Sequence, residues 1–127
     1  MLFAAFILFI NEETVQMTMK LKNFKTVWGH TGTIEEAVTM AKEAGFSGLE
    51  APAKHDDPNH FPALQAAIEK HNIEWIQEIC TAGSYVPRRR ASVEEHLADL
   101  ESQIILGKSL KPKFVNVMGG CDAWPIQ

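Results

Sequence analysis

The side chains best suited to chemistry in this sequence of 127 residues follow short apolar runs. Glu50 ends the run 46–50. A carboxylate there could accept a hydrogen bond from a sugar hydroxyl, or act as a general base if its pKa is raised. The alternative is a buried structural ion pair, because a buried carboxylate needs a partner whatever its role. We predict Glu50 as the catalytic residue.

Five further residues are predicted to bind a substrate. Two tryptophans offer flat apolar walls for the C–H face of a sugar ring, and the other side chains can exchange hydrogen bonds with hydroxyl groups. For the tryptophans the alternative is simple packing, and for the histidine it is a hydrogen bond within its own loop. The predicted binding residues are Trp28, His30, Asn116, Asp122 and Trp124.

Three other groups have reactive residue types but a simpler explanation. The run 55–60, His-Asp-Asp-Pro-Asn-His, has metal-ligand types, yet it is one loop without a strand or helix to fix a geometry, so a solvated loop is favoured. The arginines at 88–90 could grip a phosphate, although such runs are usually solvated. Cys80 and Cys121 are expected to be inert thiols, since nothing local supplies a cation to Cys121.

Positioning these residues requires regular elements, and the sequence predicts four strands alternating with three helices. Thr33 with Glu36, and Ser92 with Glu95, form the capping-box pairs that begin helices, and Gly45 lies where a left-handed C-cap belongs. The expected strands are 24–28, 46–50, 73–80 and 114–118, and the expected helices are 33–45, 61–72 and 92–106.

The order of these elements indicates a parallel sheet. Each helical segment is long enough for a right-handed crossover between parallel strands. We expect the second strand to end near Glu50, because Pro52 cannot continue it. A (β/α)₈ barrel needs about 250 residues. The predicted fold class is α/β, a partial (β/α)₈ TIM barrel over residues 22–127, with residues 1–21 as an N-terminal extension.

Composition excludes several classes of function. Apolar residues make up 46% of the sequence and charged residues 22%, which is typical of a packed globular domain. The net charge of −4 argues against nucleic acid and anionic membranes as partners. Two cysteines give no disulfide framework, so a cytoplasmic location is expected. The apolar run 1–10 is too short to span a bilayer; it is either an anchor or follows a misassigned start codon ahead of Met17 or Met19.

Three segments carry a resemblance to a known family. They are Gly29-His-Thr-Gly, Ala44-Gly-Phe-Ser-Gly-Leu-Glu50 and Lys113-Phe-Val-Asn-Val-Met-Gly-Gly-Cys-Asp-Ala-Trp124. Together they resemble the N-terminal half of the xylose isomerase-like sugar phosphate isomerase/epimerase family, from about Lys22 to the end. Members of that family often have a histidine at the end of the fourth strand, where this chain has Met118.

The resemblance implies a full-length parent that moves a proton next to the carbonyl of a small-molecule sugar bound to a divalent metal, Mn²⁺ or Mg²⁺. The family takes its metal ligands, Glu, Asp, His and Glu, from later strands. We therefore expect no metal ligand in this chain and no activity from it alone. Two alternatives stay open. One is a non-catalytic half-barrel whose copies pair as a homo-oligomer. The other is a metal-dependent hydrolase of the endonuclease IV-like branch, although the negative net charge of the sequence argues against it.

Overall fold

The computed structural model describes residues 19–83, 86 and 88–119. Strands and helices alternate along it as β1 (Phe24–Thr26), α1 (Ile34–Glu43), β2 (Gly48–Pro52), α2 (His60–His71), β3 (Glu74–Cys80), α3 (Val93–Gly107), a short 3₁₀ helix η1 (Lys108–Leu110) and β4 (Phe114–Met118). The four strands form one sheet in the order β1-β2-β3-β4, and each neighbouring pair is parallel. The predicted α/β class, with four parallel strands and three helices, is confirmed.

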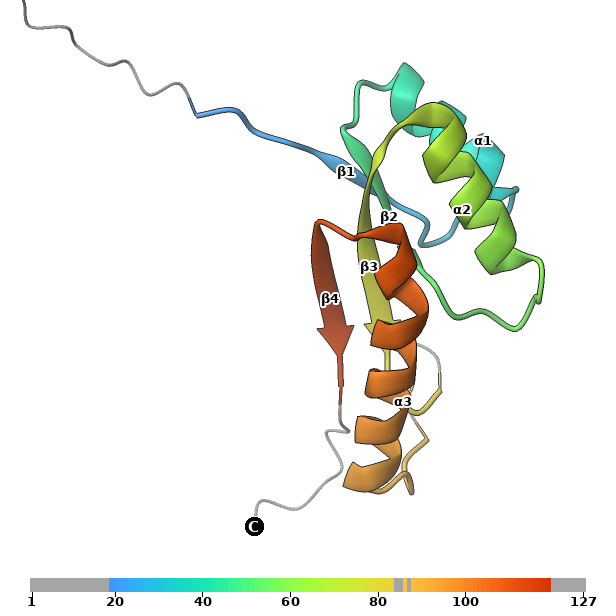
Figure 1. Ribbon diagram of the computed structural model, residues 1–127, viewed down its shortest axis with the longest axis vertical. Coiled ribbons are helices and arrows are strands. Elements are labelled where there is room, and N and C mark those ends of the chain that lie inside the picture. The colour runs from blue at the N-terminus through green and yellow to red at the C-terminus, as the bar shows by residue number, and fades with distance from the viewer. Residues whose placement is uncertain (1–18, 84–85, 87, 120–127) are drawn as a thin grey trace, which may run out of the picture.

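The sheet is covered on one face only. Because the strands lie in chain order, the crossovers never reverse, and right-handed crossovers then place every helix on the same side. Figure 1 shows the three α-helices gathered on one side of the strands. Side chains alternate between the two faces of a strand, so Leu49, Trp75 and Ile79 point to the helices and are buried. The other face is called the open face below.

The two capping boxes and the left-handed glycine predicted from the sequence are confirmed. Thr33 caps α1 and Ser92 caps α3, and in both cases the glutamate three residues later completes the capping box. Each box satisfies two backbone N–H groups that a helix start would otherwise leave unpaired. Gly45 has a φ of +78°, which a residue with a Cβ atom rarely adopts.

The prediction that the second strand ends near Glu50 is wrong, because β2 continues through Pro52. Thr26, the last residue of β1, is level with Glu50, so Pro52 lies beyond the end of β1. The backbone nitrogen of Pro52, which carries no hydrogen, therefore lies where no neighbouring strand needs it as a donor for a ladder hydrogen bond. The carbonyl of Pro52 is used instead by the His60 ring, at 2.8 Å.

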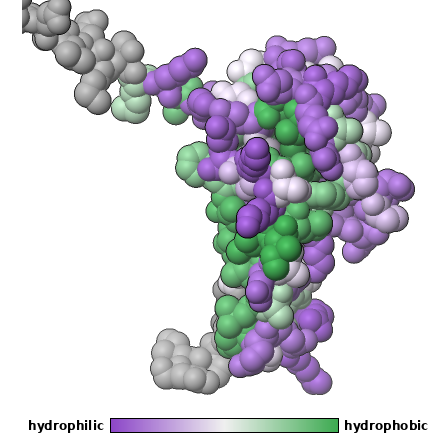
Figure 2. Space-filling model, in the orientation of Figure 1, coloured by the Kyte–Doolittle hydropathy of each residue, from purple (hydrophilic) through white to green (hydrophobic). Residues whose placement is uncertain are grey.

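β4 and the outer side of α3 leave apolar side chains exposed. All five residues of β4 are exposed, including Phe114, Val115 and Val117. Figure 2 shows apolar side chains gathered over β4 and the adjoining face of α3. None of the helices in the described part of the chain has the length and apolarity needed to cross a bilayer.

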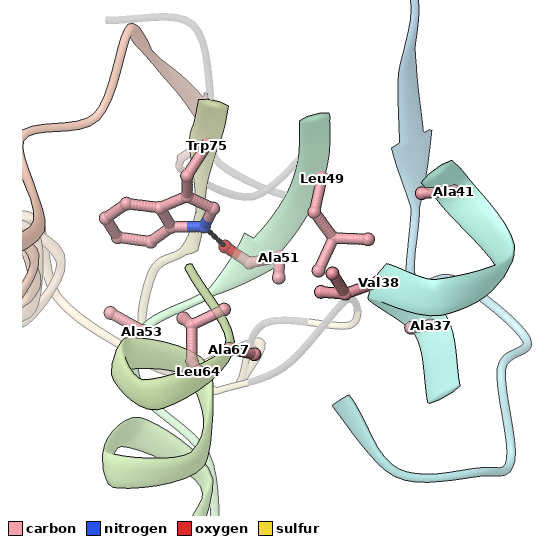
Figure 3. Packing of buried hydrophobic residues seen from close by; sticks show 9 residues of the cluster. All are labelled: Ala37, Val38, Ala41, Leu49, Ala51, Ala53, Leu64, Ala67 and Trp75. Atoms are coloured by element: carbon pink, nitrogen blue, oxygen red, sulfur yellow. Dashed lines mark hydrogen bonds between the residues drawn. The ribbon is translucent and has the colours of Figure 1, made fainter. Parts of the chain in front are cut away.

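The hydrophobic core lies between the covered face of the sheet and the helices α1 and α2. Figure 3 shows Trp75 and Leu49 of the sheet facing the small and branched side chains of the helices, such as Val38 and Leu64. The indole Nε1 of Trp75 donates to the backbone oxygen of Ala51 at 3.1 Å, so its polar atom is satisfied within the core. This core fixes β2 and β3, the two strands that carry the carboxylates described next.

Candidate functional site

Three polar residues share the open face near the carboxyl ends of neighbouring strands. In the register of the sheet, Glu78 of β3 is level with Asn116 of β4 on one side and with Pro52 of β2 on the other. Glu50 lies two residues before Pro52 on β2. Residues two apart on a strand point to the same face. In parallel α/β proteins, groups at this end of the strands are the ones that meet a ligand.

Glu78 is the most deeply placed of these groups, with only 1% of its surface exposed. Its Oε1 accepts a hydrogen bond from the indole Nε1 of Trp28 at 2.7 Å and from the thiol of Cys80 at 3.8 Å. Its Oε2 is buried and finds no hydrogen-bond partner among the described residues. A buried acceptor without a partner is rare in native proteins, and it points to a proton or a ligand at that atom.

The surroundings of Glu78 favour its neutral form. Burial raises its pKa from the ordinary value of 4.5, and the negative charge of Glu50 raises it further. The hydrogen bond from Trp28 acts in the opposite direction but does not outweigh burial. Burial, together with the charge of Glu78, also raises the pKa of Cys80 to about 11, so this thiol stays protonated near neutral pH.

Glu50 has a different environment from Glu78. It is half-buried, and its Oε1 accepts a hydrogen bond from the side-chain amide of Asn116 at 2.9 Å. The ion pairs among the described residues do not include Glu50. Its partner is therefore a neutral amide, and the structural ion pair considered for Glu50 is not formed within this part of the chain.

A pocket of about 220 Å³ lies at the carboxyl ends of β2 and β3. Glu78 and Cys80 form part of its wall, and Gln103 of α3 reaches it from the covered side. This volume is below the roughly 300–1,000 Å³ typical of pockets for drug-sized ligands. The other lining residues are Pro52, Lys54, His55, Asp56 and Gly83.

The rim of this pocket is fixed by Asp99 of α3. Its carboxylate accepts hydrogen bonds from Lys54 Nζ at 2.6 Å and from the backbone N–H of Ala82 at 2.7 Å. Burial acts to raise the pKa of Asp99, but the hydrogen bonds from Lys54 and Ala82 outweigh it and hold the pKa below its ordinary value. One side chain thus ties together the loops that follow β2 and β3.

The structure brings together three of the residues predicted from the sequence, namely Trp28, Glu50 and Asn116. His30 instead lies in the loop after β1, where its Nε2 is 3.0 Å from the backbone oxygen of Thr33. This contact matches the alternative of a hydrogen bond within its own loop. The predicted residues Asp122 and Trp124 lie outside the described residues, as does Cys121.

Sequence reasoning missed Glu78, although one signal for it existed. Cys80 was considered as the end of its strand, and Glu78 lies two residues earlier, so the two must share a face.

The remaining polar clusters are held by local contacts. In the loop 55–60 the rings of His55 and His60 stack with centroids 4.5 Å apart, and Asp57 accepts from the backbone N–H of Asn59 at 2.9 Å. Arg88 pairs with Glu95 at 3.1 Å on the surface. Among the described residues, no group of three or more His, Cys, Asp and Glu could hold a metal ion.

Comparison with known proteins adds no relative from which a function could be carried over. No family model, no curated protein and no solved structure matches this chain.

Proposed function

We propose that this chain forms half of a (β/α)₈ barrel and carries part of the active site of a sugar isomerase or epimerase of the xylose isomerase-like type. The sheet supports the barrel, because four parallel strands in chain order with helices on one face are what one half of such a barrel requires. The site supports the chemistry. The observation that carries it is the buried Oε2 of Glu78, without a partner in the described chain, on a residue that lines a pocket of about 220 Å³.

The two carboxylates divide the proton transfer between them. In this proposal Glu50, which accepts from Asn116 and faces a less buried environment, takes the proton from the carbon next to the substrate carbonyl. Glu78, whose pKa is raised, gives its proton to the carbonyl oxygen, so that an enediol forms. In isomerisation, Glu50 returns its proton to the former carbonyl carbon while the hydroxyl on the first carbon gives its proton back to Glu78, which restores both carboxyl groups. Epimerisation requires a second acid on the opposite side of the enediol, in addition to these two carboxyl groups.

Trp28 holds Glu78 in place for this step. Its indole N–H donates to Oε1 of Glu78, which leaves Oε2 to carry the proton. Half of the Trp28 surface is exposed, so the ring can also offer an apolar wall to the C–H face of a sugar. In the resembling family the metal ligands come from later strands, where a metal would hold the oxygens of the substrate, so the steps above are assigned only to side chains of this chain.

Ligand binding gives the first test. Saturation-transfer NMR with a panel of ketoses and aldoses should show contacts to the purified chain, and the Trp28 indole N–H resonance should shift on titration. Glu78→Leu should abolish both signals, whereas the control Glu43→Leu, on the exposed surface of α1, should keep them. If no sugar produces a signal at millimolar concentration, or if Glu78→Leu binds as well as the parent chain, the proposed site is wrong.

Turnover gives the second test. With Mn²⁺ or Mg²⁺ present, the chain of 127 residues is expected not to interconvert any sugar of the panel, because the metal ligands of the resembling family come from later strands. The assay follows deuterium exchange at the carbon next to the carbonyl by NMR, which detects even the first proton transfer. Metal-dependent exchange by the chain alone would contradict this expectation.

A further inference from the structure

The loop between β2 and α2 carries a histidine that stacks on the first residue of the helix. The ring centroids of His55 and His60 are 4.5 Å apart, and the ring planes differ by 17°. His60 begins α2, and its Nε2 donates to the backbone oxygen of Pro52, the last residue of β2, at 2.8 Å. The stack therefore ties His55 to the point where the loop leaves the sheet.

The hydrogen bonds of the two rings respond differently to protonation. The backbone N–H of Asp57 donates to Nδ1 of His55 at 3.0 Å, so this nitrogen carries no proton in the stack and His55 is neutral there. The oxygen of Pro52 can only accept, so Nε2 of His60 carries a proton whether the ring is neutral or charged. Protonation at Nδ1 of His55 therefore breaks its hydrogen bond, whereas protonation of His60 leaves its bond in place.

The surroundings of His60 favour the neutral ring. Burial lowers the pKa of His60 from the ordinary value of 6.5, and the charge of a protonated His55 lowers it further. The hydrogen bond to Pro52 and the charge of Asp57 act in the opposite direction but do not outweigh burial. Since the pKa is lowered on folding, the stabilisation by this ring is complete above pH 6.5 and decreases as the pH falls below that value.

The charged groups near His55 in the loop do not hold its ring in the stack. Lys54 is paired with Asp99 of α3 at 2.6 Å, so the chain is anchored as far as this residue. Asp57 accepts a hydrogen bond from the backbone N–H two residues later, at 2.9 Å, and is engaged within the loop. Asp56 is exposed, and its carboxylate can pair with a charged His55 ring that has left the stack.

His55 also forms part of the wall of the pocket that contains Glu78. The titratable groups that share this wall from β3 are Glu78 and Cys80, and α3 contributes the uncharged Gln103. The hydrogen bonds of Glu78 go to Trp28 and Cys80. A displacement of His55 therefore changes the pocket on the side of the loop and leaves the hydrogen bonds of Glu78 intact.

We propose that the stack of His55 on His60 is a pH-sensitive latch on this pocket. With both rings neutral, the latch holds the loop 55–59 against the pocket. With both rings protonated, their like charges repel and His55 loses the hydrogen bond from Asp57, so His55 moves away while His60 stays on Pro52. As regulation of ligand binding this inference rests on the proposed function, but the movement itself needs no ligand.

An NMR titration of the chain between pH 7.5 and pH 4.5 tests the latch. NOEs between the two rings are expected at pH 7.5, and they should disappear as Nδ1 of His55 takes up a proton, together with a shift of the Asp57 amide resonance. The amide resonances of β3 should stay unchanged over this range. Ring NOEs that persist after both rings are protonated, or a transition shared with the amides of β3, would overturn the inference.

A matched pair of variants sets the charge at position 60 and keeps a flat side chain there. His60→Phe is never charged, whereas His60→Arg is always charged and can still donate to the oxygen of Pro52. Compared with the parent, the pH at which His55 leaves the stack should fall by about 0.5–1 unit in His60→Phe and rise by a similar amount in His60→Arg. The same opening pH in all three chains would exclude repulsion between the rings and with it the latch.

Sugar binding separates the latch from the proposed function. Saturation-transfer signals from a bound sugar should fall at least about threefold between pH 7.5 and pH 5 in the parent, and less in His60→Phe, in which Glu78 titrates as before. Release of the stack in a chain that binds no sugar would support the latch and refute the proposed function. Sugar signals that keep their strength through the release would show that the latch does not control the pocket.

Discussion

The two faces of the sheet are built for different purposes. On the covered face, Trp75 and Leu49 are enclosed by helices, and the polar atom of Trp75 is satisfied by the backbone. On the open face, Glu78 is just as deeply buried, yet one of its carboxylate oxygens has no hydrogen-bond partner within the described chain. The first arrangement lowers the free energy of the fold, and the second raises it.

This difference shows where a function should be sought. Residues that stabilise a fold are satisfied by their neighbours, whereas a group that costs stability and faces a pocket needs another explanation. The carboxylate of Glu78 fits the second description, and Trp28, Glu50 and Asn116 are arranged around it. The predictions below ask whether the two faces differ as sharply in experiments as they do in structure.

The largest effect is expected from an aromatic residue of the covered face. Trp75→Ala should lower the free energy of unfolding by about 3–5 kcal/mol, because it removes a fully buried indole and leaves a cavity. Phe114→Ala on the open side of β4 should lower it by less than about 1 kcal/mol in the monomer, since Phe114 is 68% exposed. Urea denaturation at low protein concentration measures both. Similar losses for the two variants would contradict the contrast between the faces.

An intermediate effect is expected where the covered side supports the rim of the pocket. Asp99→Asn should cost about 1–2 kcal/mol at pH 7, because it weakens the hydrogen bonds to Lys54 and to the backbone of Ala82. The pKa of Asp99 is lowered on folding, so its contribution is present above the ordinary value of 3.8 and is lost as the pH falls through the folded value. Thermal unfolding at several pH values checks this, and a difference between parent and variant that grows toward pH 3 would count against it.

The smallest effect should have the opposite sign. Glu78→Gln replaces a buried carboxylate by a neutral group of the same shape, and it should raise the free energy of unfolding at pH 7 by about 0.5–1 kcal/mol. Because the folded pKa of Glu78 is raised, its favourable contribution is complete below 4.5 and is lost as the pH rises through the folded value. The gain should therefore vanish near pH 4. A variant less stable than the parent at pH 7 would show that Glu78 is a structural residue.

Much of the fold follows from local sequence signals. The Thr33–Glu36 and Ser92–Glu95 pairs act within one helical turn, so the sequence alone predicts where α1 and α3 begin. The end of β2 was predicted wrongly because it depends on where the neighbouring strand stops. Pro52 is tolerated in β2 because β1 already ends at Thr26, so no ladder hydrogen bond is lost.

The site was less predictable than the fold. The pattern of β3 does not say which of its polar residues faces helices, and the structure places Gln77 on the covered face and Glu78 on the open one. The sequence also does not predict that the apolar side chains of α3 face outward. The hydrogen bonds that His96 and Gln103 form with Thr81 and with the backbone of Cys80 hold the polar side of α3 toward the sheet. Both outcomes depend on contacts between residues far apart in the chain, which spacing within a segment cannot encode.

The central claim is that the open face keeps Glu78 as a buried acid beside Glu50. A pH titration of the Glu78 side-chain carboxyl carbon by ¹³C NMR, in the parent chain and in Glu50→Gln, tests it most directly. The predicted result is a pKa above 4.5 in the parent and a smaller elevation in the variant, because the variant removes the charge of Glu50 but leaves the burial unchanged. A value at or below 4.5 in the parent chain, or one that Glu50→Gln leaves unchanged, would contradict the account.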